Sequence, residues 1–194
     1  TSVINDILSG LTKLEYRGYD SSGIAYVRNN QIETYRAEGK LNNLKKNLVE
    51  KIVDTPMGIG HTRWATHGIP SKINAHPHST DEVSIVHNGI IENFLKLKTN
   101  LIDKGHIFKS QTDSEVIAHL ITDHLNSGCT PEDSIKKTLP LLEGAFAIAV
   151  IFKESKLLIG ARKGSPLALG ISKEKNYLGS DSIALAPFTQ NICF

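Results

Sequence analysis

The chain has 194 residues, of which 40% are hydrophobic and 22% charged, and its formal net charge is +2 at pH 7. These values indicate one globular domain with a substantial core, and the near balance of charge argues against a nucleic-acid or membrane partner. Two distant cysteines, no long apolar run and no signal-like N-terminus indicate a reducing compartment, so we expect a cytoplasmic protein.

Helices and strands come in groups along the sequence. Periodicity, caps and proline positions predict helices at 3–15 (capped by Thr1 or Ser2), 41–52, 91–104, 116–125 behind a capping box at 112–115, one opening at Thr130-Pro131, and a short one behind Ser180-Asp181. Alternation and turn signals predict strands at 23–27 and 32–36, one ending at 63, and others at 83–86, 145–152, 157–161, 167–171 and 177–179. Strands arranged as hairpins with helices between them predict an α+β protein with largely antiparallel sheets.

The stretch 60–68 concentrates more chemistry than any other part of the chain. Behind a short apolar segment it places a guanidinium, an indole, two imidazoles and two hydroxyls. Arg63 would end a strand there, and an arginine can hold a carboxylate with two parallel hydrogen bonds. The alternative is a structural ion pair.

Two further candidate sites lie downstream. Asn88-Gly89 follows a strand, and an asparagine side chain with a glycine N–H can form an oxyanion hole for acyl transfer. The alternative is an ordinary Asn-Gly turn. Asp113 lies in the first turn of a helix, where the helix dipole favours a carboxylate without any function. Together with Arg63, however, it would hold both ends of a free amino acid.

Four histidines suggest a metal site: His67, His76, His78 and His87. They lack a suitable ligand spacing and a carboxylate or cysteine as third ligand, so we expect no metal.

Five motifs carry a resemblance to a known family: LEYRGYDS at 14–21, HTRWATHG at 61–68, NAHPH at 74–78, HNGIIEN at 87–93 and TDSEVIAH at 112–119. They resemble the glutaminase domains of class II glutamine amidotransferases, and most closely those of the glutamine–fructose-6-phosphate aminotransferase (isomerizing) family. The resemblance implies an N-terminal-nucleophile hydrolase, a four-layer αββα sandwich with two stacked antiparallel sheets. It implies no metal and no other cofactor.

The resemblance also implies a role for each candidate residue. An N-terminal cysteine would attack the side-chain amide of glutamine, with Asn88 and Gly89 as the oxyanion hole. Arg63 would bind the α-carboxylate of glutamine and Asp113 its α-amino group. A loop would close over the substrate and gate the ammonia, and it holds Trp64, Thr66 and His67.

Other implications concern the rest of the enzyme. Ammonia would pass to separate isomerase domains that convert fructose 6-phosphate to glucosamine 6-phosphate, in a homodimer without nucleic-acid or membrane partners. Residues 1–194 would be a glutaminase domain without its opening cysteine-bearing strand and without those isomerase domains. We therefore expect residues 1–194 alone to lack glutaminase activity. The alternatives are a non-catalytic glutamine-binding module and an amidotransferase with another ammonia acceptor.

Overall fold

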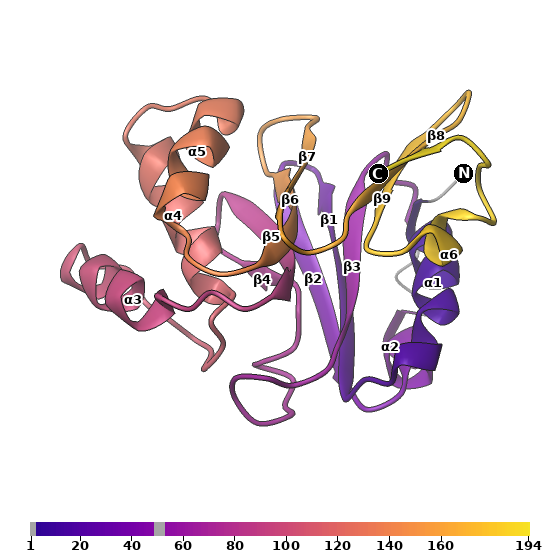
Figure 1. Ribbon diagram of the computed structural model, residues 1–194, viewed down its shortest axis with the longest axis horizontal. Helices are drawn as coiled ribbons and strands as arrows, with labels where there is room; N and C mark the ends of the chain where they lie inside the picture. Colours follow the sequence, from indigo (N-terminus) through magenta and orange to yellow (C-terminus); the bar gives the residue numbers. More distant parts are fainter. Residues whose placement is uncertain (1–2, 49–52) are drawn as a thin grey trace.

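The computed structural model describes residues 3–48 and 53–194, which form layers of helices and antiparallel strands (Figure 1). Its elements are, in chain order, α1 (Val3–Lys13), the 3-10 turn η1 (Glu15–Arg17), β1 (Ser21–Arg28), β2 (Gln31–Glu38), α2 (Leu41–Leu48), β3 (Gly58–Arg63), β4 (His78–Ser79), β5 (Val83–Gly89), α3 (Phe94–Asp103), α4 (Glu115–Asn126), α5 (Pro131–Thr138), the 3-10 turn η2 (Leu139–Leu141), β6 (Phe146–Phe152), β7 (Leu158–Lys163), β8 (Ala168–Ile171), β9 (Asn176–Gly179), α6 (Ser182–Leu185) and β10 (Ile192–Cys193). The expected helices and hairpins are present with small shifts of their bounds. Positions 1 and 2, expected as a cap, and 49–52, expected in the second helix, lie outside the described residues.

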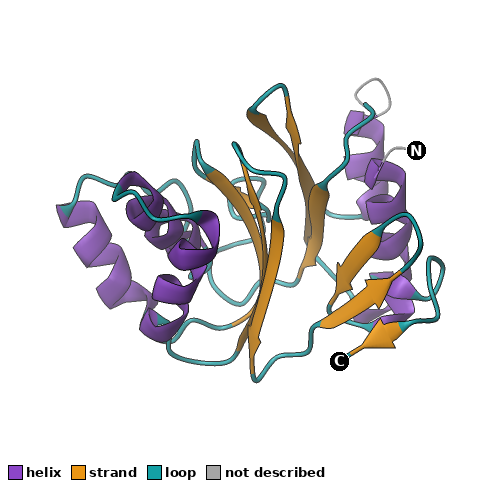
Figure 2. Ribbon diagram, turned by 90° about the horizontal axis from the view of Figure 1, so that it is seen from above, coloured by secondary structure: helices purple, strands orange, loops and turns teal. Residues whose placement is uncertain are grey.

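Hydrogen bonds join the strands into three antiparallel sheets with the orders β2-β1-β3, β4-β5-β6-β7 and β10-β8-β9. The first two are stacked between helices: α1 and α2 cover one outer face, and α3, α4 and α5 lie on the other side (Figure 2). This confirms the α+β, four-layer αββα expectation. The third sheet was not expected. It is separate because, among the described strands, β3 pairs only with β1 and β9 only with β8.

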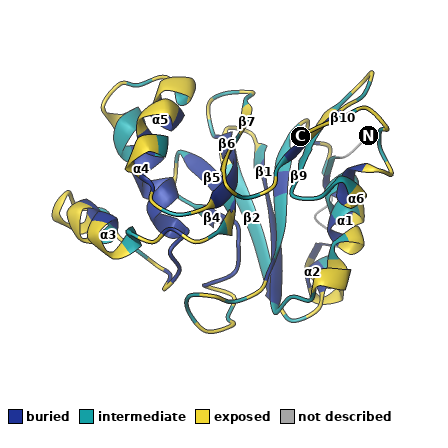
Figure 3. Ribbon diagram, in the orientation of Figure 1, coloured by how far each residue is buried: buried dark blue, intermediate teal, exposed yellow. Residues whose placement is uncertain are grey.

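Strand β6 shows how the sequence pattern sets the layers. All of its residues are buried, and side chains along a strand point alternately to opposite faces. Phe146 and Ile148 therefore join the core under the helices. Ala149 and Ile151 face the other sheet, where they meet Ala25 of β1. Burial is concentrated where the layers meet, and the outward helix faces are exposed (Figure 3).

The segment before α4 differs from the expected capping box. Ser114 occupies the N-cap position, and its side chain makes no cap hydrogen bond. The carboxylate of Glu115 instead accepts the backbone N–H groups of Lys109 and Ser110 at 2.8 and 2.7 Å. A buried carboxylate needs donors, and the loop in front of the helix supplies them. The motif therefore fixes a loop rather than a helix end.

No described helix is both long and apolar enough to span a membrane.

Candidate active site

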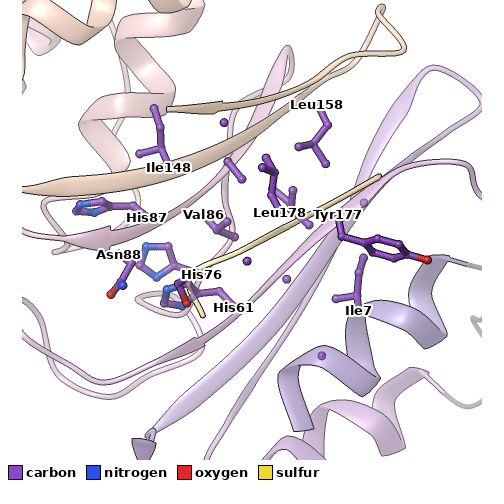
Figure 4. A pocket seen from close by; sticks show the side chains of 18 of the residues that line it. Ile7, His61, His76, Val86, His87, Asn88, Ile148, Leu158, Tyr177 and Leu178 are labelled. Carbon is purple, nitrogen blue, oxygen red and sulfur yellow. The ribbon is translucent and has the colours of Figure 1, made fainter. Parts of the chain in front are cut away.

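A cavity of about 1270 Å³ opens between β3 and β9 and reaches the ends of β5 and β6. Figure 4 shows polar side chains at one end, including Asn88 and His87, and apolar ones such as Leu178 toward the other. All seven residues expected at the site line this cavity: Arg63, Trp64, Thr66, His67, Asn88, Gly89 and Asp113. They come from segments far apart in the sequence, so the fold brings them together.

Arg63 ends β3 and is only 4% exposed. Its Nη2 donates to the carbonyl oxygen of His67 and, at 3.1 Å, to that of Gly68. Its Nη1 lies 3.9 Å from Asp20 Oδ1 and has no hydrogen-bond acceptor within the described residues. Burial lowers the pKa of Arg63, and the carboxylates of Asp20 and Asp113 oppose this shift. Arginine nevertheless stays charged, so a buried guanidinium with an unused donor favours an anionic ligand.

The loop after Arg63 is held by hydrogen bonds to Asp20, which directly precedes β1. Asp20 Oδ2 accepts the N–H of Ala65 at 2.5 Å, and the N–H of Asp20 donates to the carbonyl of Arg63 at 2.8 Å. Trp64 is 68% exposed, and its ring lies against Gly18. Gly18 has a φ of +73°, and a Cβ there would come within 2.5 Å of that ring. The indole therefore needs a glycine beneath it.

Asn88 and Gly89 end β5 beside the cavity, paired with Ala147 and Phe146 of β6. Asn88 is exposed, and its side chain makes no hydrogen bond in the described part of the chain. Gly89 has a φ of +135°, and a Cβ there would lie 2.1 Å from the carbonyl oxygen of Ala145. Only glycine fits this backbone position. The pair belongs to a strand end and not to the ordinary turn that was the alternative.

Asp113 is almost fully buried, and its two carboxylate oxygens have different surroundings. Oδ2 accepts the N–H of Ile91 at 2.8 Å. Oδ1 lies 3.8 Å from Nδ1 of His67 and 3.5 Å from the hydroxyl of Ser114. One oxygen is therefore fixed by the backbone, while the other faces the cavity-lining side chains.

Three buried histidines lie behind these residues. Burial holds the pKa of His76 well below its ordinary value of 6.5 and lowers that of His78 to about 3. Burial also lowers the pKa of His87 to about 4, against the opposing charge of Asp113. The three imidazoles are therefore uncharged at neutral pH. No group of three or more His, Cys, Asp or Glu side chains suited to a metal ion occurs within 3–48 and 53–194.

The stability of the protein is expected to fall as the pH drops below about 6.5, because these histidines bind protons in the unfolded chain but not in the folded one. Their folded pKa values are depressed, so their contribution is complete above 6.5 and is lost toward pH 4. Each costs about 1.4 kcal/mol per pH unit, so the three together contribute up to about 4 kcal/mol per unit, and His61, whose pKa burial also lowers to about 3, adds to the slope in the same way. Urea unfolding between pH 8 and pH 5 measures the slope. His78→Gln is expected to reduce it by one histidine's share, whereas a flat profile would contradict the neutral assignment.

Sequence reasoning missed Asp20 and Ser114 as parts of the site. Both lie inside motifs that carry the family resemblance, but nothing local marks their roles. Asp20 reaches Ala65 across 45 positions, and Ser114 reaches His76 across 38. The first contact lies beside the paired ends of β1 and β3, and the second joins the segment before α4 to the segment before β4; both depend on tertiary packing, which a local pattern does not specify. Cys129 and Cys193 do not line the cavity.

The stacked sheets, with this cavity at the strand ends, place the chain in the class of N-terminal-nucleophile glutamine amidotransferases. The structure matches that of glutamine phosphoribosylpyrophosphate amidotransferase from B. subtilis with a TM-score of 0.80 and 27% sequence identity, over 95% of this chain and 41% of that one. The chain belongs to the glutamine amidotransferase domain family, whose model matches residues 61–187.

Curated relatives extend the similarity to nearly the whole chain. It is 52% identical over 189 residues to the glutamine–fructose-6-phosphate aminotransferase (isomerizing) of Mesorhizobium japonicum, covering 97% of this chain and 31% of the relative. It is also 52% identical over 193 residues to the same enzyme of Bartonella henselae, covering 99% of this chain and 32% of the relative. The chain therefore spans about a third of the length of these relatives. The family expected from the motifs is confirmed.

Proposed function

We propose that this chain is the glutaminase domain of a larger aminotransferase and hydrolyses the side-chain amide of glutamine to glutamate and ammonia. The observation that carries the proposal is the gathering of an anion site, a cation site and an Asn-Gly donor pair on one cavity. Each feature alone has an ordinary structural explanation. Together they match the three polar ends of glutamine: carboxylate, ammonium and amide.

Arg63 and Asp113 hold the amino-acid end of the substrate. The unused Nη1 of Arg63 donates to the α-carboxylate, and Asp113 Oδ1 accepts from the α-ammonium. The charge of Asp113 opposes the lowering of the Arg63 pKa that burial causes, so the two groups lie near each other. This spacing suits the adjacent charges on the α-carbon of an amino acid. His67, Thr66 and Trp64 belong to the loop that closes over the bound substrate, and Trp64 gates the ammonia.

Asn88 and Gly89 stabilise the reaction intermediate. When a nucleophile attacks the amide carbonyl, its oxygen becomes negatively charged. The Nδ2 of Asn88 and the N–H of Gly89 are the donors for that charge. A thioester then forms as ammonia leaves, and water releases glutamate.

The nucleophile is an N-terminal cysteine on an extended segment that lies in the cavity between β3 and β9. Support comes from the two strand edges that border the cavity, since neither has a second partner among the described strands. A strand between them would join the β2-β1-β3 and β10-β8-β9 sheets into one. The apolar lining, with Ile7, Val86 and Leu178, suits the side chains of such a strand.

The ammonia acceptor is fructose 6-phosphate, which is handled by isomerase domains outside these 194 residues in a homodimeric enzyme. The support for the acceptor is the name of the relatives, each of which is about three times as long as this chain. On this basis residues 1–194 form a single glutaminase domain.

The test is to assay the complete protein for glutamine hydrolysis. It is expected to release glutamate and ammonia in equal amounts in the absence of fructose 6-phosphate. Arg63→Gln is expected to raise KM for glutamine about 100-fold with a smaller change in kcat, because a lost carboxylate clamp weakens ground state and transition state alike.

Arg162→Gln is the matched control, since Arg162 is an exposed arginine of β7 outside the cavity. Its kinetics should equal those of the unmodified protein. Absence of glutamate release would reject the proposed function. An unchanged KM in Arg63→Gln would reject the role of Arg63.

A further inference from the structure

Ser114 lies where three functional segments meet. Its Oγ is 2.8 Å from Nδ1 of His87, 3.0 Å from Nε2 of His76 and 3.5 Å from Oδ1 of Asp113. Ser114 is only 2% exposed, and its three neighbours are equally buried. One hydroxyl thus contacts the strand that carries Asn88, the segment before β4 and the carboxylate of Asp113.

The direction of each hydrogen bond follows from the nitrogen atoms that have no partner. Within the described residues, His76 Nδ1 and His87 Nε2 are buried without a hydrogen bond. A neutral imidazole has one N–H and one bare nitrogen, and a buried N–H without an acceptor is rarer than an unused acceptor. The unpartnered nitrogens are therefore the bare ones. His76 carries its hydrogen on Nε2 and His87 carries its hydrogen on Nδ1.

Both imidazoles then donate to Ser114. A serine oxygen can accept two hydrogen bonds and has one hydrogen to give. With both acceptor positions occupied, that hydrogen is left for Asp113 Oδ1, the third atom near the hydroxyl. If Ser114 donated to His87 instead, Nε2 of His87 would be a buried N–H with no acceptor.

We propose that Ser114 is a positioning residue, whose hydroxyl collects hydrogen bonds from the uncharged His76 and His87 and donates to Oδ1 of Asp113. It acts through Asp113 and does not touch substrate. Because His87 directly precedes Asn88, the same hydroxyl fixes the ammonium-binding carboxylate relative to the oxyanion donors. This consequence for catalysis rests on the proposed function, whereas the hydrogen-bond arrangement itself does not.

The arrangement is tested first without any substrate. Long-range ¹H–¹⁵N NMR of histidine-labelled protein distinguishes the two imidazole tautomers. The spectra are expected to show the Nε2–H form for His76 and the Nδ1–H form for His87. Either histidine in the opposite tautomer, or protonated at neutral pH, would overturn the proposal whether or not glutamine is the substrate.

The kinetic test uses Ser114→Ala and Ser114→Thr in the complete protein. Ser114→Ala is expected to raise KM for glutamine about tenfold with little change in kcat, since it loosens a carboxylate that binds the ammonium in ground and transition states alike. Ser114→Thr keeps the hydroxyl and is expected to restore KM. Ser134→Ala is the control, because Ser134 is an equally buried serine whose hydroxyl donates to Pro131 within α5.

Unchanged KM in a folded Ser114→Ala protein would overturn the positioning role, as would an equal increase in Ser134→Ala. If Ser114→Ala does not fold, the tautomers of the unmodified protein and the KM of Ser114→Thr still decide the matter. Lack of glutaminase activity in the unmodified protein would reject the proposed function and leave the tautomer result standing.

Discussion

A chain extended at its N-terminus by a cysteine-led segment that can lie along β3 is expected to hydrolyse glutamine at least about 10⁴-fold faster than residues 1–194 alone. Arg63, Asn88 and Asp113 line the cavity, but neither Cys129 nor Cys193 does. Binding and electrostatic stabilisation alone leave a small residual rate when a nucleophile is missing. Glutamate release from both purified proteins measures the difference.

The control for this comparison carries alanine in place of the leading cysteine. It fills the cavity and stabilises the fold in the same way, so any gain in thermal stability should be shared while the gain in rate is not. Equal rates in the cysteine and alanine forms would show that another group attacks the amide. Equal stability of the extended and unextended chains would show that the segment does not occupy the cavity.

Asn88→Ala is expected to lower kcat about 10²- to 10³-fold in the complete protein, with KM for glutamine nearly unchanged. The side chain has no hydrogen-bond partner in the described structure, so its removal breaks no hydrogen bond of the fold. In the proposed mechanism its donor is used only when charge develops on the amide oxygen. A steady-state kinetic comparison with the unmodified protein separates the two parameters.

Asn93→Ala gives the matched structural control. Asn93 lies outside the cavity, and its side chain bonds the backbone of Leu141 and Glu143 at 2.9 and 3.2 Å. This variant is expected to lose stability while its kcat stays close to that of the unmodified protein. A similar loss of kcat in both variants would mean that Asn88 acts through the fold and does not stabilise an oxyanion.

Local patterns predicted the elements well where the cause is local. The apolar run of β6 and the turn at Asn29-Asn30 both predicted hairpins, because strand burial and turn geometry are set by neighbouring residues. The expected capping box before α4 was wrong for the opposite reason. Its carboxylate, Glu115, is satisfied by a loop whose position depends on tertiary packing.

The site was predictable in its members but not in its connections. Arg63, Asn88 and Asp113 stand out by residue type and by position at the ends of elements. The residues that support them do not stand out in the sequence. Ser114 can make its hydrogen bonds only when β5 and the segment before β4 lie beside it. A serine in a sequence does not show which imidazoles will surround it.

The edges of β3 and β9 that have no second partner among the described strands would, on the proposed function, link the chemistry of this protein to the completion of its fold. An unpaired strand edge is a template for association with another chain, and proteins normally cover it. If the segment that carries the nucleophile is the one that covers these edges, an incompletely folded molecule is both inactive and prone to associate. Ammonia would then be released only by molecules whose central sheet is already closed. Molecules that have not completed this sheet would consume no glutamine.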